Sequence, residues 1–315
     1  MSRAGNIAPD RGLTIRMFTT GLMLVVLYGA VIGLLIAFGI SYAVVLVFAA
    51  IILFVQYWFS DKIALFGMGG RVVTPEQAPQ LHGAIDRLCA LADMKKPRVA
   101  IANTDVPNAF ATGRSPNNAV VCATTGLMRR LDESELEAVL AHELSHVAHR
   151  DVAVMTIASF LGVVAGLITR ILFWSGMMGG FGGGFGGGRG GNNNGQDNAA
   201  LVELAVLVVS VVVYAISFLL TMALSRYREL AADRSGALLT GRPSALASAL
   251  VKVTGEMSRI PTRDLRSAES FNAFYFTPAI AKNGVSLSTL FSTHPSLDQR
   301  LAQLAKIEAE LGRPS

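Results

Sequence analysis

Residues 17–60 read MFTTGLMLVVLYGAVIGLLIAFGISYAVVLVFAAIILFVQYWFS, a run of 44 residues without a single Asp, Glu, Lys, Arg or His. One crossing of a bilayer needs about 20 apolar residues, so the run is long enough for two crossings, with a turn near residues 39–41. The apolar region of a cleavable signal peptide is only about 7–15 residues long. The run therefore predicts a transmembrane hairpin.

Two further apolar runs lie between residues 152 and 225. The first extends from Val152 to Thr169 and, after Arg170, on to Trp174, and the second extends from Leu204 to Ser225. Each is close to the length of one crossing, which predicts two more spans; buried core helices are the alternative. The chain is 52% hydrophobic and 16% charged, whereas soluble domains carry about 25% charged residues. This composition excludes a disordered chain and argues against a wholly soluble enzyme.

A glycine-rich connection separates these two runs. It holds 11 glycines between Gly176 and Gly191, followed by three asparagines at 192–194. Such a segment is flexible and buries little surface, and it lacks the Gly-Lys-Ser/Thr ending of a phosphate-binding loop. We interpret it as a connector outside the bilayer.

The positions of Lys and Arg predict which side of the membrane each segment occupies, because cytoplasmic segments carry an excess of these residues. The glycine-rich connection has only Arg189, with Arg170 at its border, whereas several Lys and Arg lie near the other ends of the apolar runs. The prediction is a mainly α membrane protein with four transmembrane helices and a cytoplasmic α+β domain. Its segments are a cytoplasmic tail (1–16), a transmembrane hairpin (17–60), a first cytoplasmic part (61–151), a third span (152–175), an outer loop (176–198), a fourth span (199–225) and a second cytoplasmic part (226–315).

The two cytoplasmic parts contain patterns of both helices and strands. Apolar residues at helical spacing predict a helix over 78–92, and short apolar runs at 97–102 and 119–123 are typical of strands. Asp132, followed three residues later by Glu135, indicates a capping box at the start of another helix. The second part is predicted to form helices at 226–239, 244–257 and 297–311.

The helix that begins after Asp132 carries the sequence HELSH at residues 142–146. His142 and His146 are four residues apart, so they lie about 40° apart around a helix and about 6 Å apart along it. Two imidazoles so placed can bind one metal ion, with Glu143 close to a water molecule on that ion. This is the HExxH arrangement of metalloproteases, in which the glutamate is the general base. A solvated helix face with paired charges is the alternative.

A third ligand has to come from elsewhere in the chain. His149 shares the helix face, but it lies about 10.5 Å of helix rise beyond His142, while zinc–nitrogen bonds are about 2 Å long. No glycine bend of the metzincin kind precedes it. Glu229, just after the fourth span, is the better candidate, and Asp233 is placed to accept a hydrogen bond from a ligating histidine. For these two acidic residues, a surface salt-bridge face with neighbouring arginines is the alternative.

The sequence leaves open what holds Glu229 near the histidines. A flexible glycine-rich connector transmits little rigidity. Either metal coordination or packing of the third and fourth spans must therefore set the distance between the two segments.

These motifs together resemble the HtpX family of membrane zinc proteases, which is related to the CAAX prenyl proteases. The resemblance covers nearly the whole chain. It rests on the four apolar spans and on PNAFATG at 107–113, TTGLM at 124–128, HELSH, the Glu229/Asp233 pair and HPSLDQR at 294–300. It implies a zincin-like protease domain that holds one Zn²⁺ per chain with His142, His146 and Glu229, with Glu143 as the catalytic residue. The long Gly/Asn-rich connection departs from the family but affects only the outer loop.

The resemblance also implies roles for residues outside the metal set. Asn108, with Ala109 and Phe110, is expected to contact substrate, and this extended segment can pair with a substrate peptide as an added strand. His294 and Arg300 are expected to support the active site. His294 is a candidate for stabilising charge in the transition state, with a purely structural role as the alternative.

The implied function is a zinc-dependent, membrane-bound endopeptidase that acts at the cytoplasmic membrane surface in the quality control of misfolded or damaged membrane proteins, with a role in stress. The expected location is a bacterial inner membrane, crossed several times, with the catalytic domain in the cytoplasm. The expected partners are polypeptide substrates, membrane proteins among them, and the lipid bilayer. The sequence predicts no nucleic-acid partner and no particular oligomeric state. Cys89 and Cys122 are far apart and are expected to be free thiols.

Two other functions remain open. An intramembrane zinc protease carries its metal motif inside an apolar span and a distant LDG sequence, whereas HELSH is flanked by charged residues such as Asp132, Arg150 and Asp151, and no LDG occurs. A non-enzymatic membrane scaffold or holdase has no need for Glu143.

Overall fold

The structure is a computed structural model that describes residues 15–27, 42–156, 158, 164, 166, 193–259 and 294–312. Contacts between residues divide the chain into two compact units. One comprises Met1–Phe18, Val55–Met155 and Met222–Ser315, and the other comprises Thr19–Phe54 and Thr156–Thr221. Most of the predicted third span, most of the predicted outer loop and the segment 260–293 lie outside the described residues.

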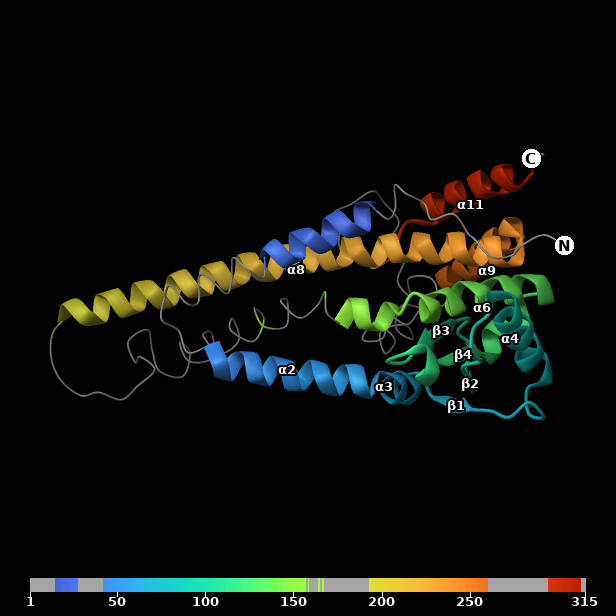
Figure 1. Cartoon of the computed structure of the whole chain (residues 1–315), viewed down its shortest axis with the longest axis horizontal. Coiled ribbons are helices and arrows are strands. Elements are labelled where there is room, and N and C mark those ends of the chain that lie inside the picture. The colour runs from blue at the N-terminus through green and yellow to red at the C-terminus, as the bar shows by residue number, and fades with distance from the viewer. Residues whose placement is uncertain are drawn as a thin grey trace. The chain divides into compact units, whose positions relative to one another are not determined.

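The first unit contains a small mixed sheet of four strands (Figure 1). The strands are β1 (Gly70–Val72), β2 (Arg98–Ala102), β3 (Ala109–Thr112) and β4 (Val120–Thr124). Their order is β1-β2-β4-β3; β2 and β4 are parallel, and the two outer pairs are antiparallel. All residues of β4 are buried, as expected for a central strand covered on both faces. The edge strand β3 borders the helix that carries HELSH.

Helices cover the sheet because alternate strand residues point to opposite faces. On one face, Val121 and Ala123 pack with α4 (Pro79–Ala92) and α6 (Glu133–Ala148). On the other face, Val120 and Cys122 pack with α3 (Ser60–Gly67). A short 3₁₀ turn, η1 (Pro116–Asn118), precedes β4, and α5 (Thr125–Arg130) follows it.

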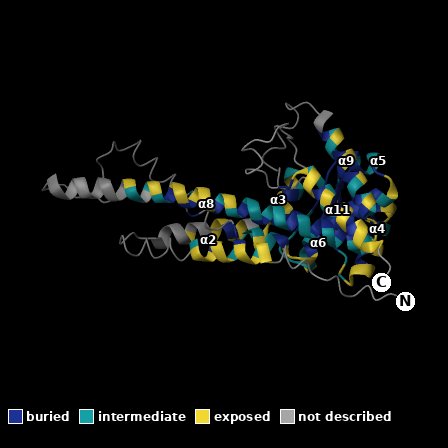
Figure 2. Ribbon diagram, turned by 90° about the horizontal axis from the view of Figure 1, so that it is seen from above, coloured by how far each residue is buried: buried dark blue, intermediate teal, exposed yellow. Residues whose placement is uncertain are grey.

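A second apolar cluster joins α6 to the C-terminal helices α9 (Pro243–Arg259) and α11 (Leu297–Leu311). Its fully buried members include Val139 on α6, Leu250 on α9 and Leu304 on α11. Buried residues concentrate where these helices and the sheet pack together (Figure 2). The predicted α+β character is confirmed, because the described chain is mostly helical with one small sheet.

The start of α6 is fixed by side-chain hydrogen bonds to the backbone. The Asp132 carboxylate accepts a hydrogen bond from the Glu135 backbone N–H at 2.9 Å, and the Glu135 carboxylate accepts one from the Asp132 backbone N–H at 3.0 Å. This is the predicted capping box. The helix ends at Ala148, and Arg150 then adopts a left-handed conformation with φ 57°, which turns the chain sharply before Asp151.

The helix α8 (Asn193–Thr240) is continuous, so the predicted borders at 198/199 and 225/226 both fall inside a helix. Its part Leu207–Thr240, 34 residues long, is the one helix in the described ranges that is long and apolar enough, by length and composition, to cross a membrane. Ile15–Leu27 is a shorter apolar helix, and α2 spans Tyr42–Trp58. The predicted hairpin and third span stay predictions.

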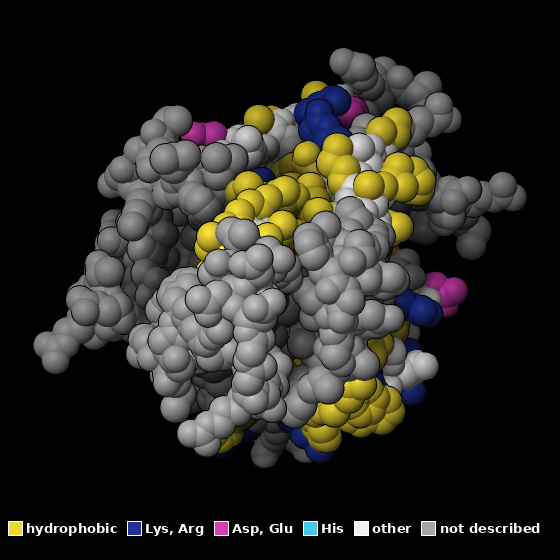
Figure 3. Space-filling view, turned by 90° about the vertical axis from the view of Figure 1, so that its left-hand side faces the viewer, with side chains coloured by type: hydrophobic (Ala, Val, Ile, Leu, Met, Phe, Trp, Pro, Cys, Tyr) yellow, Lys and Arg dark blue, Asp and Glu magenta, His cyan; other side chains and the backbone are white. Residues whose placement is uncertain are grey.

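Several apolar side chains on α8 are exposed. Val208, Val211 and Val212 are about half exposed, at 53%, 48% and 50%, and Figure 3 shows hydrophobic side chains gathered on the described surface of one face. Exposed apolar surface of this kind is typical of a membrane contact. Cys89 and Cys122 are buried and free, as predicted.

Candidate metal centre

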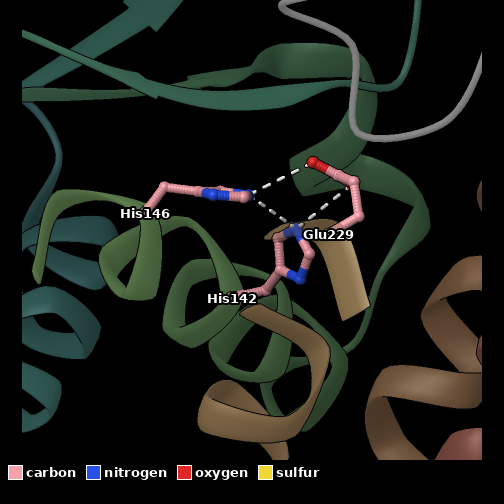
Figure 4. A group of neighbouring side chains, drawn as sticks. All are labelled: His142, His146 and Glu229. Atoms are coloured by element: carbon pink, nitrogen blue, oxygen red, sulfur yellow. Dashed lines mark hydrogen bonds and ion pairs between the residues drawn. The ribbon is translucent and has the colours of Figure 1, made fainter. Parts of the chain in front are cut away.

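Three side chains from two helices converge on one point in the first unit (Figure 4). His142 and His146 lie on successive turns of α6, and their Nε2 atoms are 3.2 Å apart. Glu229, on α8, places Oε1 at 3.4 Å from Nε2 of His146 and Oε2 at 3.8 Å from Nε2 of His142. The three ligand atoms lie within 4.8 Å of one another.

This spacing fits a tetrahedral metal ion. Two atoms at about 2.0–2.1 Å from one zinc ion, in tetrahedral geometry, are roughly 3.4 Å apart, close to the observed separations. Two imidazoles and one carboxylate are a ligand set that zinc prefers. His149, the alternative ligand, is the C-cap residue of α6 and is not among the converging donors of the described chain.

Each histidine is held at its other ring nitrogen by an aspartate. Nδ1 of His142 lies 2.9 Å from Oδ1 of Asp233, and Nδ1 of His146 lies 2.6 Å from Oδ2 of Asp151. When Nδ1 carries the proton and donates it to the carboxylate, the lone pair of Nε2 is directed to the point where the three side chains meet. The structure thus brings Asp233 to the place predicted for it and adds Asp151.

Each of these aspartates is in turn paired with a buried arginine. Arg300 donates two hydrogen bonds to Asp233, at 2.7 and 2.6 Å, and Arg228 forms an ion pair with Asp151. Asp233 is fully buried and Arg300 is 2% exposed. A buried charge is tolerated only when it is paired. The alternative of a surface salt-bridge face for Glu229 and Asp233 is therefore wrong.

The other predicted support residue, His294, contacts Glu229, one of the three candidate ligands, directly. Its Nδ1 lies 3.0 Å from Oε2 of Glu229, and its side chain is buried. This contact orients Glu229, and it makes His294 part of the site although it is far from HELSH in the sequence. The HPSLDQR motif thus supplies one residue that contacts Glu229 and a second, Arg300, that holds Asp233.

Glu143 lies beside the two histidines and is almost fully buried, with 4% of its surface exposed. It accepts a hydrogen bond from the backbone N–H of Ala111 on β3, and burial raises its pKa to about 8. A cation bound next to it would favour the ionised form. Burial lowers the pKa of His142, against the opposing effect of Asp233, which favours the neutral imidazole that binds metals.

The predicted substrate segment forms the edge strand β3 and the residue before it. The Asn108 carbonyl accepts a hydrogen bond from the Thr124 N–H at 2.9 Å, so the backbone of Asn108 faces β4. Because antiparallel pairing alternates, the backbone groups of Ala109 and Ala111 face the edge of the sheet, where no further strand lies among the described residues. The side chains of Asn108, Ala109 and Phe110 are buried, at 0%, 1% and 3% exposed. This segment therefore offers a peptide its backbone rather than its side chains.

Two contributors to the site were not predicted from the sequence. In the sequence, Asp151 is only one of the charged residues that flank HELSH. Arg228 is only one of the arginines near Glu229 that could form surface salt bridges. The available signal was an acidic residue just after the end of a metal-binding helix and a basic residue just before Glu229. Neither residue type predicts that Asp151 contacts His146 and Arg228, because those contacts depend on the turn at Arg150.

Comparison with known proteins gives a consistent family. The model of peptidase family M48 matches residues 75–308. The chain is 59% identical over 304 residues to Protease HtpX homolog 1 from Streptomyces coelicolor, covering 96% of this chain and 95% of that protein. It is 54% identical over 306 residues to Protease HtpX homolog from Moorella thermoacetica, covering 97% of each.

The fold is also similar to a solved structure, the crystal structure of S. mikatae Ste24p. The TM-score is 0.52 at 18% sequence identity, covering 93% of this chain and 66% of that chain. At this identity the likeness concerns the fold. The resemblance inferred from the sequence motifs is confirmed by these matches.

Proposed function

The chain belongs to peptidase family M48, and on that premise we propose that it is a zinc-dependent membrane endopeptidase that hydrolyses polypeptides at the cytoplasmic membrane surface. One observation carries the proposal. Three donor atoms of His142, His146 and Glu229 lie within 4.8 Å of one another, and the carboxylate of Glu143 lies buried beside them. This is a metal site with an adjacent general base, which hydrolysis requires.

Each polar residue of the centre has a distinct role in this reaction. The three ligands would hold one zinc ion, which when bound supplies Lewis acidity to a water molecule and to the scissile carbonyl. Glu143 accepts the proton of the attacking water and delivers it to the leaving amine. The backbone N–H of Ala111 fixes the position of Glu143. His294 orients Glu229 through its 3.0 Å contact.

The substrate is a polypeptide bound in an extended conformation along β3. The outward backbone groups of Ala109 and the carbonyl of Ala111 can pair with it as an added strand, while the Ala111 N–H stays on Glu143. Because Ala111 also contacts Glu143, a peptide paired there passes close to the general base. Recognition through backbone hydrogen bonds gives a loose sequence preference.

The reaction takes place at the membrane surface. Glu229 follows directly after the predicted fourth span, and α6 ends just before the predicted third span, so both halves of the site adjoin membrane segments in the sequence. The distribution of Lys and Arg assigns this side to the cytoplasm. The lipid bilayer is a permanent partner, and a bacterial inner membrane is the proposed location. The proposed role is quality control of damaged membrane proteins, in line with the HtpX resemblance.

The test is cleavage of an unfolded protein such as casein by the full-length chain in detergent. Glu143→Gln should lower kcat by about 10²- to 10⁴-fold while zinc remains bound. The control is Glu137→Gln, on the same helix but in a surface ion pair with Arg87, which should remain active. Chelation should abolish cleavage, and added zinc should restore it.

Equal activity of wild type and Glu143→Gln would contradict the proposal. Suppression of substrate aggregation by the wild type without any cleavage would instead support the holdase alternative.

A further inference from the structure

The helices that carry the metal ligands make direct backbone contact at one glycine, Gly236 on α8. A Cβ atom built on Gly236 would lie 2.8 Å from the backbone N of His142, 3.0 Å from its Cα and 3.1 Å from the carbonyl C of Ala141. Contacts below 3.0 Å are not tolerated, and the atoms it would meet are backbone atoms of α6, which cannot rotate away. Any residue larger than glycine must therefore move the two helices apart.

The position of this contact links it to the metal centre. Glu229, Asp233 and Gly236 are spaced i, i+4 and i+7, so they lie on one face of α8. All three meet His142: Gly236 at its backbone, Asp233 at Nδ1 at 2.9 Å, and Glu229 near Nε2 at 3.8 Å. Gly236 lies one helical turn after Asp233 and two turns after Glu229. It thus sets the separation of α6 and α8 close to the two side chains that must reach His142.

We propose that Gly236 is a positioning residue for the metal site: the α6–α8 backbone contact that it permits sets the ligand spacing before any metal binds. The proposal rests on the proposed metal function. It assigns the distance between Glu229 and the histidines to packing of α8 on α6, within the first unit, and not to metal coordination or to the membrane spans.

A small displacement has a large effect at such a site. Coordination tolerates deviations of only about 0.2 Å in ligand distance, and an added Cβ needs a shift of a few tenths of an ångström to regain an ordinary contact distance. The apolar clusters on either side of α6 can absorb a shift of that size with a modest loss of packing. Metal affinity should therefore fall more than the stability of the metal-free protein.

The test compares Gly236→Ala with two control variants in the full-length, detergent-solubilised protein. Leu250→Ala removes a fully buried side chain of α9 from the cluster that packs on α6, so it destabilises the unit without touching the α6–α8 contact. Gly255→Ala adds a Cβ on α9 that would meet no described atom within 4 Å outside the backbone of its own helix. For each variant, zinc affinity is measured by competition with a chelator, the Co²⁺-substituted absorption spectrum is recorded, and the unfolding midpoint of the metal-free protein is determined.

Gly236→Ala should weaken zinc binding by about tenfold or more and alter the Co²⁺ spectrum. Leu250→Ala should lower the unfolding midpoint with zinc affinity unchanged, and Gly255→Ala should resemble the wild type in both. Wild-type affinity in Gly236→Ala, or an equal loss of affinity in Leu250→Ala, would overturn the proposal. A wild type that binds no zinc would instead refute the proposed metal function.

A second measurement does not depend on the folding of any variant. If packing presets the site, wild-type protein stripped of metal should keep the resistance of residues 226–259 to limited proteolysis. New cleavage within that segment after chelation, reversed by zinc, would show that the metal positions α8, and would overturn the proposal.

Discussion

At the scale of single residues, the candidate metal centre has charged side chains buried behind its three converging residues. Each of the two histidines contacts an aspartate, and each aspartate is neutralised by an arginine. The two chains of contacts are His142–Asp233–Arg300 and His146–Asp151–Arg228. Such outer contacts fix the ring orientation and raise the basicity of the ligating nitrogen.

We expect Asp151→Asn to weaken zinc binding by about 10- to 100-fold. Asparagine keeps an oxygen near Nδ1 of His146 but removes the negative charge, and it leaves the buried Arg228 without its partner. Zinc affinity measured by chelator competition checks this. Asp86→Asn is the control, because Asp86 pairs with Lys96 on the surface and its loss should not change the affinity. Equal affinity of the two variants would refute the role of Asp151.

Residue-level prediction from the sequence works best where the spacing is local. The HELSH motif lies on one helix, as predicted, and Glu229, proposed because three ligands cannot converge from one straight helix, lies within 4.8 Å of its histidines; its role as a ligand stays a prediction. Asp151 lies beyond the end of α6, so helical periodicity does not predict where its side chain points. That direction is set by the left-handed backbone conformation of Arg150. From the sequence alone, Gly236 is only a residue of low helix propensity. Its role depends on its contact with the backbone of α6, which the sequence does not reveal.

At the scale of elements, α6 and α9 are joined by the buried carboxylate of Glu135. It accepts hydrogen bonds from Ser248 Oγ at 2.6 Å and from Lys252 Nζ at 2.8 Å, in addition to the Asp132 backbone N–H. Glu135 therefore takes part in the capping box of α6 and also accepts hydrogen bonds from two residues of α9. This contact joins α9 to the helix that carries His142 and His146.

Glu135→Ala should destabilise the protein by about 1–3 kcal/mol, because it removes the capping interaction with the Asp132 backbone and the hydrogen bonds from Ser248 and Lys252. Urea unfolding of the metal-free protein checks this, and zinc affinity should stay unchanged. Glu133→Ala in the same helical turn is the control, since Glu133 is highly exposed and its loss should change stability by less than about 0.5 kcal/mol. A larger effect in the control than in Glu135→Ala would contradict the assignment.

The interaction of Glu135 with Lys252 and Ser248 predicts that the stability of the protein depends on pH. Burial raises the pKa of Glu135, but hydrogen bonds from Lys252 and Ser248 outweigh it, so the pKa lies below its usual value. A carboxyl with a lowered pKa contributes stability above its unfolded pKa of about 4.3, and this contribution is lost as pH falls through the folded pKa. The difference in stability between wild type and Glu135→Ala should therefore shrink below about pH 4.

Elements with strong internal patterns were predictable. The helix expected over 297–311 is α11, and that expected over 78–92 is α4 less its first residue, because both show apolar spacing and clear end signals. The strand β1 was not predicted, since three residues carry little pattern and an edge strand depends on its partner. The start of α8 at Asn193 was missed, because an asparagine-rich stretch is typical of a connector.

At the scale of the whole molecule, the borders of the two contact units lie close to the ends of the apolar runs in the sequence. Met155/Thr156 and Thr221/Met222 separate the units, near the predicted borders at 151/152 and 225/226. Long uncharged runs are strong signals in a sequence, and their positions account for this agreement. Their membrane assignment and their orientation remain predictions.

Cysteine labelling tests that orientation. A cysteine at position 193 should react with a membrane-impermeant reagent from the outer face, and one at position 312 only from the cytoplasm. Background should be low, because burial raises the pKa of Cys122 to about 12 and also raises that of Cys89. Labelling of both introduced cysteines from the same face would mean an even number of crossings between them and would contradict the single crossing that the predicted topology places there.

The central claim is that His142, His146 and Glu229 hold one metal ion, and zinc bound per chain tests it most directly. The metal content of purified wild type, Glu143→Gln and Glu229→Ala is measured by mass spectrometry after equilibration with zinc and removal of excess. Two neutral imidazoles bind zinc far more weakly than a set completed by a carboxylate. The account predicts one zinc per chain in wild type and in Glu143→Gln, and almost none in Glu229→Ala. Full occupancy in Glu229→Ala would contradict it.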